Sequence, residues 1–151
     1  MKLAEALRLR ADLQKRIAQL EARVKLVVRI QEGEDPAENP EELMAELSLA
    51  LNQLEDLIFR INHTNMMTCA EGESLTALIA RKDVLSLRIS VLRSILEQAS
   101  GSVDRYSVNE IRYVRTVNVA TMQKQVDDLS RSLRELDVRI QQLNWMTDLL
   151  D

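Results

Sequence analysis

The polar side chains with the widest chemical range gather in three short stretches of the chain. In the first stretch, Asn62 and Asn65 stand three residues apart, so they share one face of a helix. The second stretch places a carboxylate next to basic side chains. The third stretch combines arginine with tyrosine. Guanidinium, amide and carboxylate groups can together bind a polar or anionic small molecule through directed hydrogen bonds. The candidate ligand-binding residues are Arg60, Asn62, Asn65, Asp83, Arg105 and Tyr106.

Each stretch also has a purely structural interpretation. Asn65 continues an apolar stripe, and an amide at such a position commonly fixes the register of a helix or satisfies buried backbone groups. Lys82, next to Asp83, interrupts another stripe, which predicts a snorkelling lysine or a buried ion pair. The arginines and tyrosines after Gly101 can equally pin a loop to the fold. Both interpretations stay open from the sequence.

The usual catalytic and cofactor motifs are missing. The chain has no GxGxxG and no P-loop, so it has no standard nucleotide cradle. Its one histidine and one cysteine, His63 and Cys69, cannot build a nitrogen–sulfur zinc site within one chain. A ferritin-like di-iron site needs Glu three residues before His, and Arg60 stands there. We predict no metal site of these kinds and no particular cofactor; an oxygen-only site, or one shared between subunits, stays open.

Long helices must position these residues. Hydrophobic residues make up 46% of the 151 residues but aromatics only 3%, and apolar residues recur in steps of three and four. Asn39 followed by Pro40 is a strong helix start, and Asn118 is a second N-cap candidate. The sequence predicts an all-α antiparallel four-helix bundle forming one domain over 1–151. The predicted helices cover residues 2–32, 40–69, 74–99 and 118–149.

The stripe expected to face the core in the second helix comprises Leu43, Leu47, Leu51, Leu54, Ile58, Ile61 and Asn65. Further apolar residues lie outside the stripes of the second and third helices and are therefore surplus to one core. These are Leu49, Leu57, Phe59, Leu87 and Val91.

The segment 101–117 before the last helix differs from the rest. Ser107 to Glu110 matches a capping box, which predicts a short helical turn. Residues 111–117 alternate β-branched, aromatic and basic side chains, which is typical of an extended arm. We expect an irregular or extended insertion, with a β-hairpin as one form, pairing within the segment or with another subunit.

Charge is distributed unevenly along the chain. Residues 1–29 hold eight Lys or Arg against three Asp or Glu, whereas residues 31–59 hold nine acids and no Lys or Arg. This opposition favours pairing of the first two helices, and a basic face for an external anionic partner is the alternative. With a net charge of −4, nothing favours nucleic acid as a partner. We also expect no transmembrane segment, no secretion signal and a cytoplasmic location.

Several segments together resemble, almost end to end, the septicolysin-like family of small bacterial proteins. The matching pieces are Met1–Leu7 with Arg10–Gln14, Arg60–Asn62 with Thr64–Asn65, Arg105–Ser107 with Glu110–Ile111, and Gln141 with Asn144–Trp145. At the position of His63 the family pattern has Arg. The resemblance implies an all-helical cytoplasmic protein of unassigned function.

The leading functional prediction is a non-enzymatic, self-associating, homo-oligomeric helical module with a structural or binding role. The surplus apolar residues and the lone extended segment motivate it. The first alternative is a small-molecule- or metal-dependent enzyme or binder, with a polar site at one end of the bundle. A cytolysin-like activity is the weakest alternative, because the sequence offers no membrane span.

Overall fold

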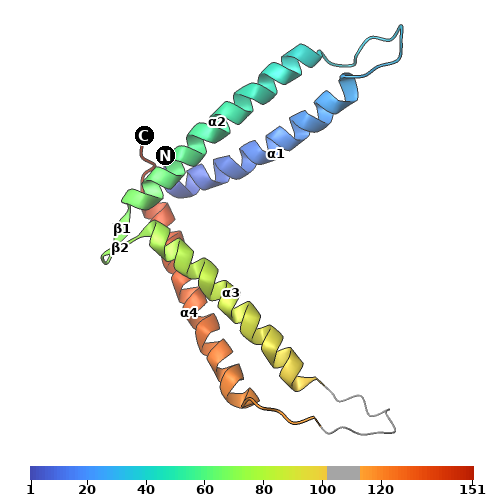
Figure 1. Ribbon diagram of the computed structural model, residues 1–151. Coiled ribbons are helices and arrows are strands. Elements are labelled where there is room, and N and C mark those ends of the chain that lie inside the picture. The colour runs from blue at the N-terminus through green and yellow to red at the C-terminus, as the bar shows by residue number, and fades with distance from the viewer. Residues whose placement is uncertain (102–112) are drawn as a thin grey trace, which may run out of the picture. The chain divides into compact units, whose positions relative to one another are not determined.

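The computed structural model describes residues 1–101 and 113–151 (Figure 1). Its long elements are four helices: α1 (Leu3–Val27), α2 (Pro40–Met67), α3 (Leu75–Ser100) and α4 (Val119–Met146). Two short strands, β1 (Cys69–Ala70) and β2 (Glu73–Ser74), lie between α2 and α3. The prediction of an all-α fold with an irregular insertion before the last helix is confirmed.

Two helix ends differ from the predicted ones by three residues or more, and the others agree within two. α1 ends at Val27 rather than near residue 32, and the chain then turns through Gly33, whose φ of 90° suits glycine. α4 ends at Met146 rather than at 149, because the residues after it pair with the start of the chain. The predicted caps hold: Asn39 Oδ1 accepts the Glu41 N–H at 2.9 Å, and Asn118 Oδ1 accepts the Thr121 N–H at 3.0 Å.

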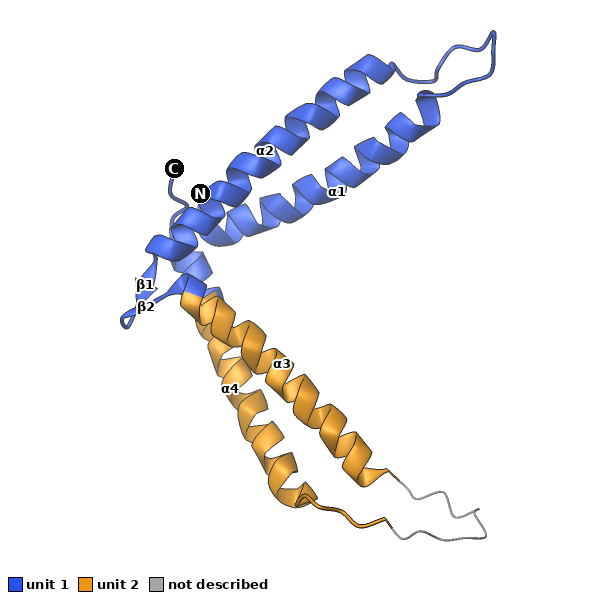
Figure 2. Ribbon diagram, in the orientation of Figure 1, with its two compact units in different colours: residues 1–76, 141–151 blue, residues 77–140 orange. Residues whose placement is uncertain are grey.

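The chain divides into two compact units, one of residues 1–76 with 141–151 and one of residues 77–140 (Figure 2). In the first unit, α1 and α2 form an antiparallel pair. The core of this pair consists of Leu20, Val24, Val27, Leu43 and Ala50. Arg16 pairs with Glu46 at 2.8 Å, and Arg23 pairs with Glu38. The opposite charges of the two segments therefore meet across this pair, as the sequence predicts.

The buried face of α2 is rotated from the predicted one. Its buried residues are Leu43, Ala50, Leu57, Ile61 and Thr64, whereas Leu51 and Ile58 are exposed. Successive residues of an α-helix are rotated by 100° about its axis. α2 carries apolar side chains over so much of its circumference that either of two phases, each burying a different face of the helix, was compatible with the sequence. Packing against α1 selects the phase that buries Leu57, which the sequence suggested to be surplus.

The second unit pairs α3 with α4 through one hydrophobic seam. Its buried residues are Ile89, Leu96 and Val126, with Leu85, Leu92, Val119, Met122, Leu129 and Leu133 packed around them. Lys82 forms a half-buried ion pair with Asp137 of α4. This pair agrees with the structural interpretation of the lysine that breaks the α3 stripe.

The connection from α2 to α3 is a tight β-hairpin that the sequence did not predict. Cys69 pairs with Ser74, and Ala70 pairs with Glu73. Glu71 and Gly72 between them have φ values of 54° and 84°, the signs found in type I′ turns. In the insertion before α4, residues 113–117 form no strand. The predicted turn at 107–110 and the first two residues of the predicted arm lie outside the described residues.

Candidate functional site

The two ends of the chain meet in the first unit. The Leu3 N–H donates to the Thr147 carbonyl at 2.9 Å, and the Leu149 N–H donates to the Met1 carbonyl at 2.9 Å. Between these bonds, Lys2 Nζ lies 2.9 Å from a carboxylate oxygen of Asp148. Residues 147–149 thus pair in antiparallel fashion with residues 1–3, and residues 147–151 are called here the C-terminal segment.

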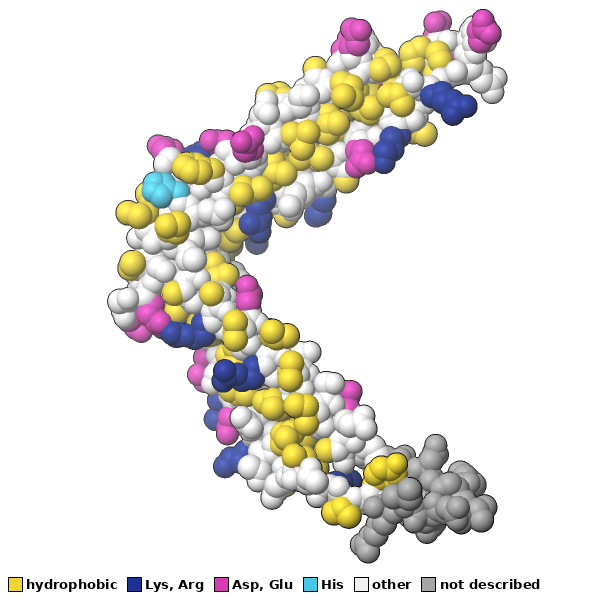
Figure 3. Space-filling view, viewed as in Figure 1, with side chains coloured by type: hydrophobic (Ala, Val, Ile, Leu, Met, Phe, Trp, Pro, Cys, Tyr) yellow, Lys and Arg dark blue, Asp and Glu magenta, His cyan; other side chains and the backbone are white. Residues whose placement is uncertain are grey.

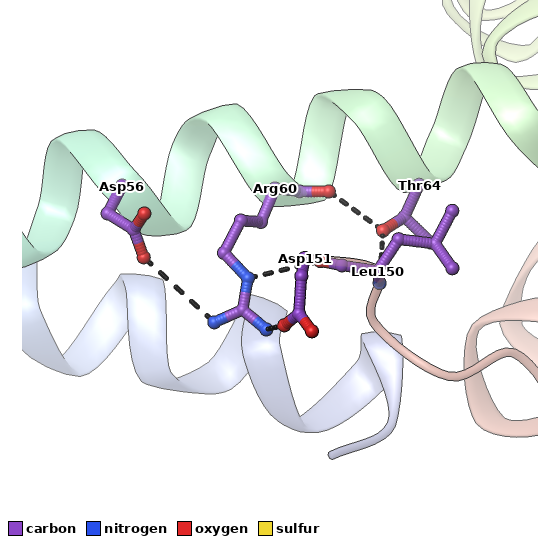
Figure 4. Close-up of polar contacts among 5 residues, drawn as sticks. All are labelled: Asp56, Arg60, Thr64, Leu150 and Asp151. Atoms are coloured by element: carbon purple, nitrogen blue, oxygen red, sulfur yellow. Dashed lines mark hydrogen bonds and ion pairs between the residues drawn. The ribbon is translucent and has the colours of Figure 1, made fainter.

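Arg60 and Thr64 of α2 hold the same segment from the other side (Figure 4). Arg60 Nε donates to the Leu150 carbonyl at 3.0 Å, and Arg60 Nη2 donates to a carboxylate oxygen of Asp151 at 2.7 Å. Thr64 Oγ1 accepts the Leu150 N–H at 3.0 Å and donates to the Arg60 carbonyl at 2.7 Å. The two side chains together satisfy both backbone groups of one extended residue and one acidic side chain.

Burial and charge differ between the members of this site. Thr64 is fully buried, with 0% of its surface exposed, so its hydroxyl is well screened from competing water. The side chain of Asp151 is fully exposed, and Asp56 lies 3.9 Å from the Arg60 guanidinium on the opposite side. At the neighbouring contact, a hydrogen bond from Lys2 and then its positive charge hold the pKa of Asp148 below its usual range.

The groups in this arrangement are hydrogen-bond donors and acceptors suited to binding a peptide. The guanidinium donates to a carbonyl and to a carboxylate, and the hydroxyl beside it accepts an amide N–H. Groups arranged in this way can bind an extended acidic peptide. The chain fills the site with its own residues Leu150 and Asp151. In the structure, Arg60 therefore holds the protein's own C-terminal segment, and its guanidinium is engaged on both edges.

The predicted site residues separate into three groups. Arg60, Asn62 and Asn65 lie within two turns of α2, where Asn62 is exposed and Asn65 is half-buried. Asp83 is exposed on α3, in the second unit. The last two candidates, Arg105 and Tyr106, lie outside the described residues. The partners of Arg60 that the sequence missed are Thr64, Leu150 and Asp151.

Two further groups belong to the same unit. His63 has a buried Nδ1 with no hydrogen-bond partner among residues 1–101 and 113–151, and its ring centroid lies 6.1 Å from that of Phe59. The guanidinium of Arg8 lies 5.3 Å from the ring centroid of Trp145, a cation–π contact that joins α1 to the end of α4. Over residues 1–101 and 113–151, no three His, Cys, Asp or Glu side chains gather closely enough to bind a metal ion.

No helix in the described part of the chain combines the length and the apolar character that crossing a membrane requires. A family model of unknown function, DUF6847, matches residues 10–149, and the chain belongs to this family. It is similar to a solved structure described as a functionally unknown conserved protein from Corynebacterium diphtheriae. That match has a TM-score of 0.91 and 38% sequence identity, and it covers 99% of each chain. No curated protein matches.

The comparisons support membership of the DUF6847 family. They do not support the septicolysin-like assignment. Both the family and the solved relative are described as functionally unknown. These descriptions agree with the prediction of an unassigned function, and they assign no role to Arg60 or Thr64.

Proposed function

We propose that this protein is a self-associating helical module whose role is structural or binding. The observation that carries the proposal is the amount of apolar surface that two-helix packing leaves uncovered. Each helix of a pair packs one face on its partner, and among the described residues of its own unit no helix covers a second apolar face on α2 or on α3.

On α2 the uncovered face lies beside the buried one. Met44, Leu51 and Ile58 recur every seven residues and are all exposed, which places them on one line of the helix. On α3 the exposed apolar residues are Val84, Leu87, Val91 and Ile95. Figure 3 shows hydrophobic side chains gathered in bands along both helix pairs. Exposed apolar bands of this kind usually mark surfaces that contact another macromolecule.

A second copy of the chain is the simplest partner, because a homo-oligomer supplies matching faces by symmetry. Light scattering coupled to gel filtration at micromolar concentration tests this. We expect a mass of at least twice the 17.3 kDa of one chain. A strict monomer at concentrations up to the order of 100 micromolar, which corresponds to a binding free energy of only about −5 kcal/mol, would refute the proposal.

The alternative of a ligand binder is favoured by one observation, the exposed amide of Asn62 within one turn of Arg60 and Thr64. A small acidic molecule would have to displace the C-terminal segment or bind beside it. A thermal-shift screen of carboxylate and phosphate metabolites, with Arg60→Gln as the control, tests this alternative.

We also propose the cytoplasmic location and the septicolysin-like relationship that the sequence suggests. Dye release from loaded vesicles would support lytic activity instead.

A further inference from the structure

We propose that α3 pairs with α3 of a second copy, in parallel and in register. The contact surface is the outer α3 stripe, defined as Val84, Leu87, Val91 and Ile95. The inference rests on the proposed self-association and specifies the surface and orientation through which it occurs.

The outer α3 stripe is a second apolar face on a helix that already has one. Its residues follow each other in steps of three, four and four, and they are 43–63% exposed. The inner face, with Ile89 and Leu96 at its centre, packs on α4. A helix that is apolar on both sides is normally covered on both sides in its functional state.

The order of side chains in the stripe favours a parallel pair. In a heptad frame, Val84 and Val91 occupy a positions and Leu87 the d position between them. β-branched residues at a with leucine at d favour parallel two-stranded packing. Ile95 then occupies an e position at the edge of the seam and extends its apolar surface.

Two charges beside the stripe select the same orientation. In this frame Asp83 is a g residue and Arg88 the e residue of the next heptad, both are exposed, and the structure gives neither an ion pair within the described ranges. A parallel pair places Asp83 of each copy beside Arg88 of the other, which forms two symmetric ion pairs. An antiparallel pair with Leu87 against Val91 would instead place the two Arg88 side chains together.

The available area fits a reversible dimer. The four side chains expose roughly 300 Å² of apolar surface per copy, taking about 150 Å² for a fully exposed aliphatic side chain. Since an interface is only about 57% apolar, this corresponds to roughly 1,100 Å² in total. A specific interface needs about 1,000 Å², so the stripe is sufficient without a wide margin.

Charge reversal tests the pairing and its direction together. In the parallel pair, Arg88→Glu places a new carboxylate beside Asp83 of the other copy, and Asp83→Arg places two guanidinium groups together. We expect each single variant to weaken dimerisation roughly fivefold at low salt, and an equimolar mixture of the two to recover it as a heterodimer. If R88E dimerises like the wild type, the parallel pairing is wrong.

Disulfide trapping gives an independent readout. In a Cys69→Ser background, Leu87→Cys would place the two new thiols opposite each other at d, so mild oxidation should yield a covalent dimer. Ser86→Cys, exposed on the same helix away from the stripe, is the matched control and should stay monomeric on a denaturing gel. Equal trapping at residues 86 and 87 would overturn the proposal.

Leu87→Asp separates this inference from the proposal on which it rests. We expect this variant to keep the wild-type helical circular-dichroism spectrum and to dimerise roughly tenfold more weakly or worse, since it places a charge in the apolar seam. A wild-type chain that is monomeric removes both the self-association and the α3 pairing. An L87D chain that still associates like the wild type removes only the α3 pairing.

Discussion

Thr64 is the buried side chain through which α2 holds the C-terminal segment, and Thr64→Val replaces its hydroxyl with a methyl group. Valine keeps the β-branched shape, so packing against the surrounding side chains changes little. The hydroxyl makes two hydrogen bonds, one to the Arg60 carbonyl at 2.7 Å and one from the Leu150 N–H at 3.0 Å. The Arg60 carbonyl keeps its helical partner, whereas the Leu150 N–H loses its acceptor.

The expected cost follows from this asymmetry. A typical hydrogen bond contributes about 1 kcal/mol net, and a buried donor left without an acceptor costs about 1–3 kcal/mol. The Leu150 N–H is only partly buried, so we expect T64V to lose about 1–2 kcal/mol of unfolding free energy. If the C-terminal segment opens separately from the rest of the unit, the same energy raises its open fraction roughly fivefold to thirtyfold.

Urea denaturation measures the global effect, and hydrogen–deuterium exchange of the peptide covering residues 147–151 measures the local one. Ser48→Ala is the matched control, because Ser48 Oγ makes the same back-bond, to the Met44 carbonyl at 2.9 Å, on the exposed side of α2. The control should stay within about 0.5 kcal/mol of the wild type. If T64V leaves both the urea midpoint and the exchange of residues 147–151 unchanged, the hydroxyl does not hold the segment.

Other predictions concern the rest of the chain. Leu20→Ala, at the centre of the α1–α2 core, should cost about 2–5 kcal/mol in urea denaturation. Gly72→Ala should cost about 1–2 kcal/mol, since a φ of 84° strains any residue with a Cβ. The pKa of Asp148 is depressed in the folded state by Lys2, so this contact stabilises the protein at neutral pH and its contribution is lost as acid protonates the carboxylate. The urea midpoint should therefore fall less steeply with acid in Lys2→Met than in the wild type. Calorimetry should show one cooperative transition if residues 1–151 act as one domain, and two resolved transitions would contradict this expectation.

The helix ends with local chemical signals could be predicted closely. Asn39 with Pro40 fixes the start of α2, because a cap side chain and a proline at the first turn act over only a few residues. Asn118 does the same for α4. The ends set by distant contacts were not predictable, and α4 stops at Met146 because residues 147–149 find partners at the other end of the chain.

The candidate site, too, could be predicted from the sequence only where local signals define it. Arg60 could be singled out from its residue type, but its partners could not, because Leu150 and Asp151 lie 90 and 91 positions away along the chain. Thr64 was missed because the buried face of α2 depends on how α1 packs, and the sequence allowed a phase in which Asn65 took its place. Besides its place in the Thr64–Asn65 piece of the family resemblance, the signal for Thr64 was its spacing of seven residues from Leu57, which is informative only once that phase is known.

The hydrogen bond from the Leu149 N–H to the Met1 carbonyl holds the two ends of the chain side by side, so the path of the backbone is almost a closed circle. A short glycine-containing linker from Asp151 to Met1 would close that circle, and the chain could be opened instead at Gly33, which lies in an exposed turn. Such a circular permutant begins with α2 and joins α4 to α1 directly. The contact between the two original ends, now held by hydrogen bonds, would then be a covalent connection within one continuous polypeptide.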